Sequence, residues 1–234
     1  MLKEVDKNIW VAEQKLKYLG LQVGTRMTII RLNNGELVVI SPIKLDKETI
    51  NQVNELGKVS IIIAPNLYHH LFISNFKSVY PDAKVFAAPG LDSKRQDINF
   101  DKIINQGKIG TQDEIEYFLF EGFKTLSPKG AFPLNEIVFF HKESQTLILT
   151  DTAFHFDETF PLITQLITRL IGGYKKLEPS ILEKLAIREK QKVKNSIKTV
   201  LKWNFERVIV AHGSIIDNQG KEKLKKGYNW VLSS

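Results

Sequence analysis

The chain has 234 residues, a hydrophobic content of 43% and a mean hydropathy of −0.15, values typical of a soluble globular protein. It contains no cysteine, so disulfides and thiolate ligands are excluded and any metal site must use His, Asp, Glu or water. The net charge of +7 is compatible with nucleic acid or an anionic membrane surface as a partner. No nucleic-acid-binding motif accompanies the charge, which argues against nucleic acid.

The N-terminal segment and the apolar stretches bear on location. The first ten residues, MLKEVDKNIW, lack the apolar core of a signal peptide, so we expect a cytoplasmic protein. The longest apolar stretch, residues 160–173, contains Gln165 and Arg169 and is shorter than the roughly 20 residues that span a bilayer. The sequence shows no linker, and we expect one domain over residues 1–234.

Short apolar runs and turn signals predict the elements of the first half. The turn Asn33-Asn34-Gly35 favours a hairpin because such residues accept positive φ. Asp46 is the predicted N-cap of a helix that Gly57 ends. The predicted strands are 8–11, 27–32, 36–40, 59–64 and 84–88, and further helices are expected at 71–79 and, within a surface segment, at 100–104.

The second half repeats the pattern of hairpin and helix. A hairpin across residues 142–145 places His141 at a turn, where we expect it to be exposed to solvent. Ser180 and Glu183 form a predicted capping box that begins one long helix ending near Leu201. The predicted strands are 115–120, 136–141, 146–150 and 207–211, and an apolar helix at 160–170 is expected to be buried or to contact a partner.

Three apolar strands end in residues that commonly bind metals: His69, Asp151 and His212. Two imidazoles and a carboxylate on rigid strand ends suit zinc, iron or manganese, and such an ion can activate water. Taken singly, each residue is more often a hydrogen-bonding loop or turn residue. The recurrence at three strand ends is what indicates a site.

The segments IIIAPNLYHH, TLILTD and VIVAHG, each at the end of a strand, resemble the metallo-β-lactamase fold. The resemblance covers nearly the whole chain and implies an αββα sandwich of the α/β (α+β) class. More narrowly, RMTIIRL–NNGELVVISPI and APNLYHHLF resemble a branch of that superfamily known as a domain of unknown function, with degenerate metal motifs. Superfamily members often insert a helical pair over the substrate, which implies a helical insertion at about 157–203.

The resemblance also implies a ligand set. The superfamily signature His-x-His-x-Asp-His, with its final histidine placed on His69, puts the aspartate on Tyr68 and the other histidines on Asn66 and Ala64. A register shifted by one residue places the final histidine on His70 instead. In either register most of the first metal site is lost.

The later motifs are partly retained. The third-motif histidine has no counterpart in residues 126–136, whereas the bridging aspartate matches Asp151 and the last histidine matches His212. Ser41 stands where the family usually carries an aspartate, and we expect it to anchor its loop. Candidates that would complete a non-standard site, each with an alternative structural role, are Asn66, Tyr68, His70, Glu136 and His155.

Two functional hypotheses follow. The first is a hydrolase with a single zinc, iron or manganese ion on His69, Asp151 and His212, acting on an ester-type bond of an unidentified small molecule. The alternative is a non-catalytic binding or scaffolding module that has lost most of the metal site and binds no metal. Either is compatible with a membrane-surface or protein contact through residues 160–173 and the basic helix that follows, unless that segment is a lid over the substrate.

Overall fold

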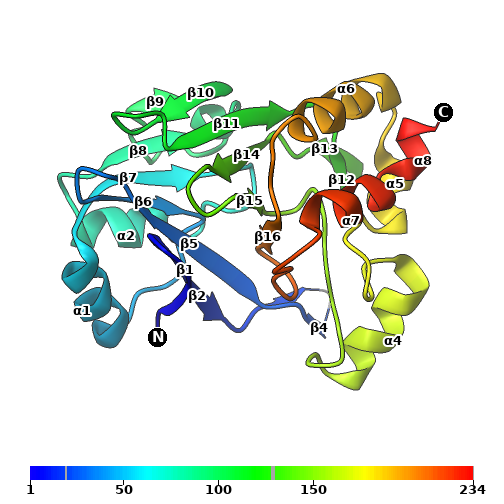
Figure 1. Cartoon of the computed structure of the whole chain (residues 1–234), viewed down its shortest axis with the longest axis horizontal. Coiled ribbons are helices and arrows are strands. Elements are labelled where there is room, and N and C mark those ends of the chain that lie inside the picture. Colours follow the sequence, from blue (N-terminus) through cyan, green and yellow to red (C-terminus); the bar gives the residue numbers. More distant parts are fainter. Residues whose placement is uncertain (19, 128–129, 234) are drawn as a thin grey trace.

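The computed structural model describes residues 1–18, 20–127 and 130–233. Two β-sheets lie at the centre, and helices flank them on both sides (Figure 1). The first sheet has seven strands in the order β1-β2-β5-β6-β7-β8-β9. Their bounds are Lys3–Asp6, Ile9–Gln14, Thr25–Arg31, Glu36–Ile40, Lys58–Ala64, Lys84–Ala87 and Lys102–Ile103.

The second sheet has five strands in the order β10-β11-β14-β15-β16. Their bounds are Gln106–Ile109, Ile115–Phe120, Glu136–His141, Thr146–Leu149 and Arg207–Val210. Two small hairpins stand apart, β3 with β4 and β12 with β13, at Lys17–Tyr18, Leu21–Gln22, Lys124–Ser127 and Gly130–Pro133. The segment 126–136, in which a metal ligand is missing from the sequence, includes residues 128 and 129, which lie outside the described residues.

Three helices follow the strands of the first sheet and five accompany the second. The first three, α1 to α3, are Lys47–Leu56, Ile73–Val79 and Leu91–Lys94. The others, α4 to α8, are Leu162–Ile171, Ile181–Ala186, Lys190–Val200, Gly220–Gly227 and Asn229–Leu232. The predicted N-cap is confirmed, because the side chain of Asp46 accepts a hydrogen bond from the backbone N–H of Thr49 at 2.7 Å.

The buried side chains form three layers. In β6, Leu37 and Val39 pack towards α1 and α2, whereas Val38 and Ile40 point into the space between the sheets. The residues of β14 alternate in the same way, between the sheet interface and the side of α6. Since successive side chains of a strand point to opposite faces, each sheet is covered on both sides, which gives the helix–sheet–sheet–helix sandwich.

The helix predicted at residues 100–104 is wrong. Lys102 and Ile103 form β9, which pairs with β8 in parallel, and residues 106–109 form β10 on the second sheet. Asp101 fixes the start of β9 because its carboxylate accepts a hydrogen bond from the backbone of Val85 at 2.7 Å. Pairing with distant strands therefore overrides the weak local helical pattern.

The single long helix predicted after Ser180 is also wrong. Ser180 caps α5 as expected, by accepting a hydrogen bond from the backbone of Leu182. The backbone is extended at Ile187, however, and α6 begins only at Lys190. Ile187 is buried in the core, so the break lets an apolar side chain face inward between two short helices.

The predicted exposure of His141 is wrong. His141 is only 1% exposed, and its Nδ1 lies 2.7 Å from the hydroxyl of Ser144. For the helix expected at residues 160–170 to be buried or to contact a partner, burial is excluded, because most of the leucine and isoleucine side chains of α4 face solvent. Among the described residues, no helix has the length and apolar character that crossing a membrane requires.

Candidate metal site between the two sheets

Three side chains from three strand ends meet at one point. His69 follows β7 of the first sheet, whereas Asp151 and His212 follow β15 and β16 of the second sheet. Nε2 of His69 lies 3.2 Å from Nε2 of His212 and 3.3 Å from Oδ2 of Asp151. Nε2 of His212 lies 3.2 Å from Oδ1 of Asp151. The two distances to Asp151 end on different carboxylate oxygens, and the three groups form a triangle in which one ligand atom from each residue lies within 4.8 Å of the others.

The outer nitrogen of each imidazole is held by a residue next to a strand of the first sheet, Gly24 before β5 and Ser41 after β6. Nδ1 of His212 lies 2.5 Å from the carbonyl oxygen of Gly24. A carbonyl only accepts, so Nδ1 carries a proton, and Nε2 is the nitrogen that the ring turns towards Asp151 and can offer to a metal. Nδ1 of His69 lies 2.7 Å from the hydroxyl of Ser41, which is buried at φ 56°. Both rings therefore have a fixed orientation.

Mutual charge governs the ionisation of the site. Burial works to raise the pKa of Asp151, but the adjacent imidazoles outweigh it and hold that pKa far below its ordinary range. Burial likewise works to lower the pKa of His69, and the Asp151 carboxylate outweighs it and raises the pKa of His69 above its ordinary value. The carboxylate is therefore ionised and attracts positive charge to the centre of the triangle.

Asn66 is fully buried and orients both the loop and the carboxylate. Its Oδ1 accepts hydrogen bonds from the backbone N–H groups of Tyr68 and His69, both at 2.8 Å. Backbone N–H groups only donate, so the Nδ2 group is the one that faces Asp151, and it donates to Oδ2 at 2.7 Å. Asn66 thus lies beside the triangle as a hydrogen-bond partner, with its oxygen directed away from the centre.

Glu136 lies fully buried at the start of β14 and anchors the turn that carries Asp151. Its carboxylate accepts hydrogen bonds from the backbone N–H groups of Thr150, Asp151 and Thr152 and from the hydroxyl of Thr152, at 2.6–3.0 Å. Burial and the Asp151 charge raise the pKa of Glu136. Its oxygens are occupied by the turn, so Glu136 supports the site from behind.

The other sequence candidates lie around the triangle. Nδ1 of His70 lies 2.8 Å from the Arg95 guanidinium, and burial together with Lys94 and Arg95 lowers the pKa of His70 to about 4. The ring of Tyr68 lies under the Lys94 ammonium, at 4.6 Å. His155 directs Nδ1 to the carbonyl of Ser214 at 3.1 Å. The side chain of His69, and not that of His70, therefore faces the triangle.

The sequence did not point to three residues that belong to the surroundings of the site. Arg26 of β5 is buried and donates to the carbonyls of Val210 and Gly213, which holds the segment that carries His212. Burial raises the pKa values of Tyr18 and Glu183, and the Asp151 charge contributes to both shifts. The sequence pattern marked Glu183 only as a member of the capping box. The side chains of Tyr18, Arg26 and Glu183 come near the site only through the tertiary fold, which the sequence pattern does not show.

A cavity of about 340 Å³ opens beside His212. Its lining includes Gly24, Arg26, Ala211 and Gly213, together with Thr159 and Pro161, which precede α4. The backbone on either side of His212 thus borders a space large enough for a small molecule.

A family described as a domain of unknown function (DUF4336) matches residues 6–176 of the sequence. The chain belongs to this family. No sequence among curated proteins matches it. The match covers the first sheet from β2 onward, the hairpin of β14 and β15, and two of the three residues of the triangle.

Solved structures show which fold this family member adopts. The chain is similar to the DIM-1 metallo-β-lactamase exposed to ceftazidime, with 13% identity, a TM-score of 0.68, and coverage of 98% of this chain and 96% of that one. A metallo-β-lactamase from Pontibacter korlensis gives 11% identity, a TM-score of 0.67, and coverage of 100% and 99%. The metallo-β-lactamase FIM-1 from Pseudomonas aeruginosa, in its mono-zinc form, is 8% identical with a TM-score of 0.64, and the match covers 100% of this chain and 93% of that one. The metallo-β-lactamase fold predicted from the sequence is confirmed.

Proposed function

We propose that this DUF4336 member is a hydrolase that uses one divalent metal ion, held by His69, Asp151 and His212, to cleave an ester-type bond. The observation that carries the proposal is the convergence of two imidazole nitrogens and an ionised carboxylate at 3.2–3.3 Å from one another. Ligands about 2.0–2.1 Å from a zinc ion at tetrahedral angles lie about 3.3 Å apart, which is the spacing of the two imidazole nitrogens and of each nitrogen from one carboxylate oxygen.

The chemistry of the donors supports the same conclusion. Since Nδ1 of His212 donates to Gly24, Nε2 is the nitrogen left to act as a metal ligand, and it faces the Asp151 carboxylate at 3.2 Å. A metal ion between these groups would take the place of the protons that they would otherwise share. A metal ion would also explain why each imidazole is fixed through its outer nitrogen, by Ser41 and by Gly24.

A divalent ion at this site would supply Lewis-acid chemistry that activates water for attack on an ester, thioester, phosphoester or lactone-like bond. The chain contributes the positioning. Asn66 holds Oδ2 of Asp151, and Glu136 holds the turn on which Asp151 lies. The mono-zinc form of FIM-1 is a precedent within the fold for occupation by one ion. Zinc is therefore the first metal to test, ahead of iron and manganese.

The decisive measurement is the metal content of untagged protein purified without a chelator, determined by plasma mass spectrometry. We expect about one zinc, iron or manganese per chain, and at least a tenfold loss of it in the double variant His69→Ala/His212→Ala, since three-ligand sites lose most affinity with each ligand removed. Metal-loaded protein is then screened on esters, thioesters, phosphoesters and lactones.

His155→Gln is the matched control, because this half-buried histidine lies outside the triangle. It should retain the metal content of the wild type. Protein that stays free of metal after incubation with each ion would contradict the hydrolase. It would favour the alternative, a non-catalytic binding module in which Asn66, His69 and His212 simply satisfy the Asp151 carboxylate.

We further propose that residues 1–234 form one domain and that the region 157–203 is a helical insertion. Helices α4, α5 and α6 fall within this region. The pairing of β15 with β16, on either side of it, supports the proposal, because the sheet is continuous across the inserted segment.

A further inference from the structure

Helix α4 turns polar residues towards the protein and aliphatic residues towards solvent, the reverse of the usual orientation of an amphipathic helix. Thr164, Gln165 and Thr168 are buried on one side of it, whereas the exposed side carries four aliphatic residues. These are Leu162, Ile163, Leu166 and Leu170, exposed by 54–76%. At 100° per residue the four lie within about 100° of one another, so they form one continuous stripe.

The buried side of α4 accounts for this orientation. The Thr164 hydroxyl donates to the carbonyl of Gln22 in β4, and the Gln165 amide donates to the carbonyls of Glu158 and Phe160. The polar side chains of Thr164 and Gln165 therefore find their hydrogen-bond partners on the protein side of the helix. The aliphatic stripe is therefore held outward by specific contacts.

Helix α5 repeats the arrangement over a shorter length. Ile181, Leu182 and Leu185 are exposed by 41–65%, whereas Ala186 on the same helix is buried. The three exposed residues again lie within about 100° on a helical projection. Isolated apolar residues on a surface need no explanation, but two helices with aliphatic stripes indicate a binding surface.

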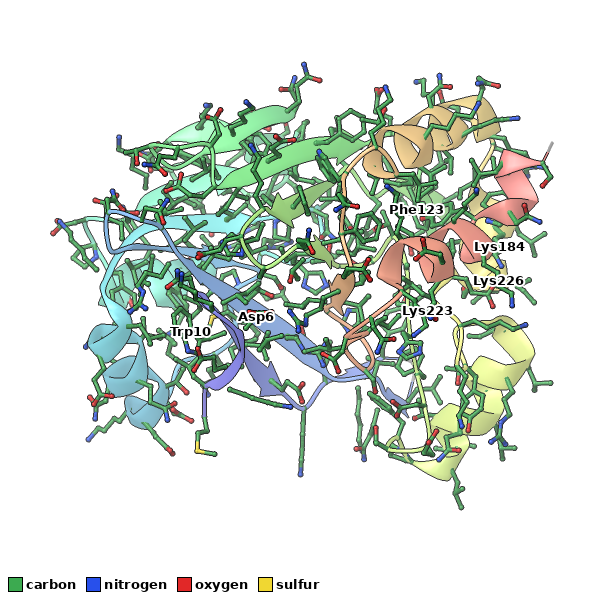
Figure 2. All side chains as sticks on the ribbon, viewed as in Figure 1. Asp6, Trp10, Phe123, Lys184, Lys223 and Lys226 are labelled. Atoms are coloured by element: carbon green, nitrogen blue, oxygen red, sulfur yellow. The ribbon has the colours of Figure 1, made fainter. Side chains whose placement is uncertain are left out.

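The excess positive charge lies in the same part of the chain. Residues 162–234 contain 15 Lys and Arg against 6 Asp and Glu, whereas residues 1–161 contain 18 against 20. Helices α4 to α8 lie on the same side of the view in Figure 1, and Figure 2 shows Lys184, Lys223 and Lys226 on that side. A β-carbon on Gly227 of α7 would lie 1.9 Å from the carbonyl oxygen of Leu177, so basic α7 packs closely against the segment that leads into α5.

We propose that the aliphatic stripes of α4 and α5 bind an anionic phospholipid bilayer, with the lysine-rich C-terminal helices facing the lipid headgroups. Aliphatic side chains that enter the interface, combined with surrounding cations, are the two signals that together give stable peripheral binding. A second copy of the chain fits less well, because two surfaces of the same strong positive charge would repel each other.

Vesicle sedimentation tests the proposal with the full chain. The wild type should sediment with phosphatidylcholine vesicles that contain about 30 mol% phosphatidylglycerol and not with pure phosphatidylcholine, and binding should weaken as salt rises above about 0.1 M. Leu162→Gln/Leu166→Gln/Leu170→Gln should weaken binding at least tenfold, because three side chains lose their burial in lipid. Lys225→Gln/Lys226→Gln should weaken binding to the anionic vesicles.

Matched controls lie in β9 and near α1, on the side of Figure 1 away from helices α4 to α8. Ile103→Gln removes an exposed aliphatic residue of β9, and Lys44→Gln/Lys47→Gln removes two cations near α1; both should bind like the wild type. Absence of binding to the anionic vesicles, or equal binding to neutral ones, would overturn the proposal. Light scattering that shows a wild-type dimer and a monomeric leucine variant would overturn it in favour of a second copy.

Discussion

Glu136 shows how a single buried carboxylate shapes the candidate site. It is 0% exposed and has no cationic side chain among its hydrogen-bond partners in the described structure. Three consecutive backbone N–H groups and a hydroxyl solvate it in place of water. The charge is thus used to close the turn at residues 150–152, from which Asp151 projects.

Replacement of this carboxylate should be costly. In Glu136→Gln an amide group would face N–H groups that only donate, and the charge-assisted bonds would be lost, so we expect the free energy of unfolding to fall by about 2–3 kcal/mol. Urea denaturation measures the change. Glu143→Gln, which removes an exposed partner of Lys7, should change it by less than about 1 kcal/mol. Equal stability of both variants would show that the buried charge is dispensable.

At this scale the sequence predicted where His69, Asp151 and His212 lie along the chain, because each follows an apolar run that predicts a buried strand. It could not predict the role of Asn66, since the partner that defines it, Asp151, lies 85 residues away. The contacts of Arg26 with the His212 segment span 184 and 187 residues and were likewise hidden.

Two elements cross very closely next to His212. Gly213 has φ 111°, and a β-carbon there would lie 2.0 Å from the carbonyl oxygen of His155. The backbone of Ser214 also donates to that carbonyl. The segment after β16 and the segment after β15 therefore pack backbone against backbone, and only glycine fits between them.

Gly213→Ala should therefore lower the free energy of unfolding by much more than the positive φ at this position alone would cause. We expect a loss of at least about 3 kcal/mol in the free energy of unfolding, because the two segments must separate. Gly35→Ala is the matched control, since Gly35 also has positive φ but open space around its α-carbon; it should cost about 1–2 kcal/mol. Similar losses of stability in the two variants would show that the segments at Gly213 separate without an energetic penalty, and would contradict this prediction. Thermal or urea unfolding provides the comparison.

Local signals predicted the elements whose partners are near in the chain, such as the hairpin of β5 and β6 and the capped helix α1. They failed for β9 and β10, which are strands only because β8 and β11 lie beside them. They also failed at Ile187, where the need to bury one side chain ends a helix that the periodicity favours.

The molecule as a whole should lose stability in mild acid. Burial lowers the pKa values of His70, His141 and His155 in the folded state below the ordinary 6.5. As pH falls below 6.5 the unfolded chain takes up protons that the folded chain refuses, so stability decreases with falling pH, by up to about 1.4 kcal/mol per pH unit for each histidine. Urea unfolding at pH 7, 6 and 5 measures the slope.

His69 has the opposite shift, so its stabilising contribution is fully present below pH 6.5 and is lost as pH rises through its raised pKa. It therefore does not add to the slope below pH 6.5. His141→Gln should therefore reduce the slope below pH 6.5, because it removes the least exposed of the three histidines with lowered pKa. An unchanged slope in this variant would assign the acid sensitivity to other groups.

The triangle of His69, Asp151 and His212 takes one member from the seven-stranded sheet and two from the five-stranded sheet. An ion bound as proposed would connect the two halves of the sandwich, so the sheets could not separate without releasing it. A ligand that binds only the folded chain lowers the population of open forms in proportion to its occupancy. The lifetime of this protein against proteases would then follow the supply of metal, and depletion of the ion would remove the protein together with its activity.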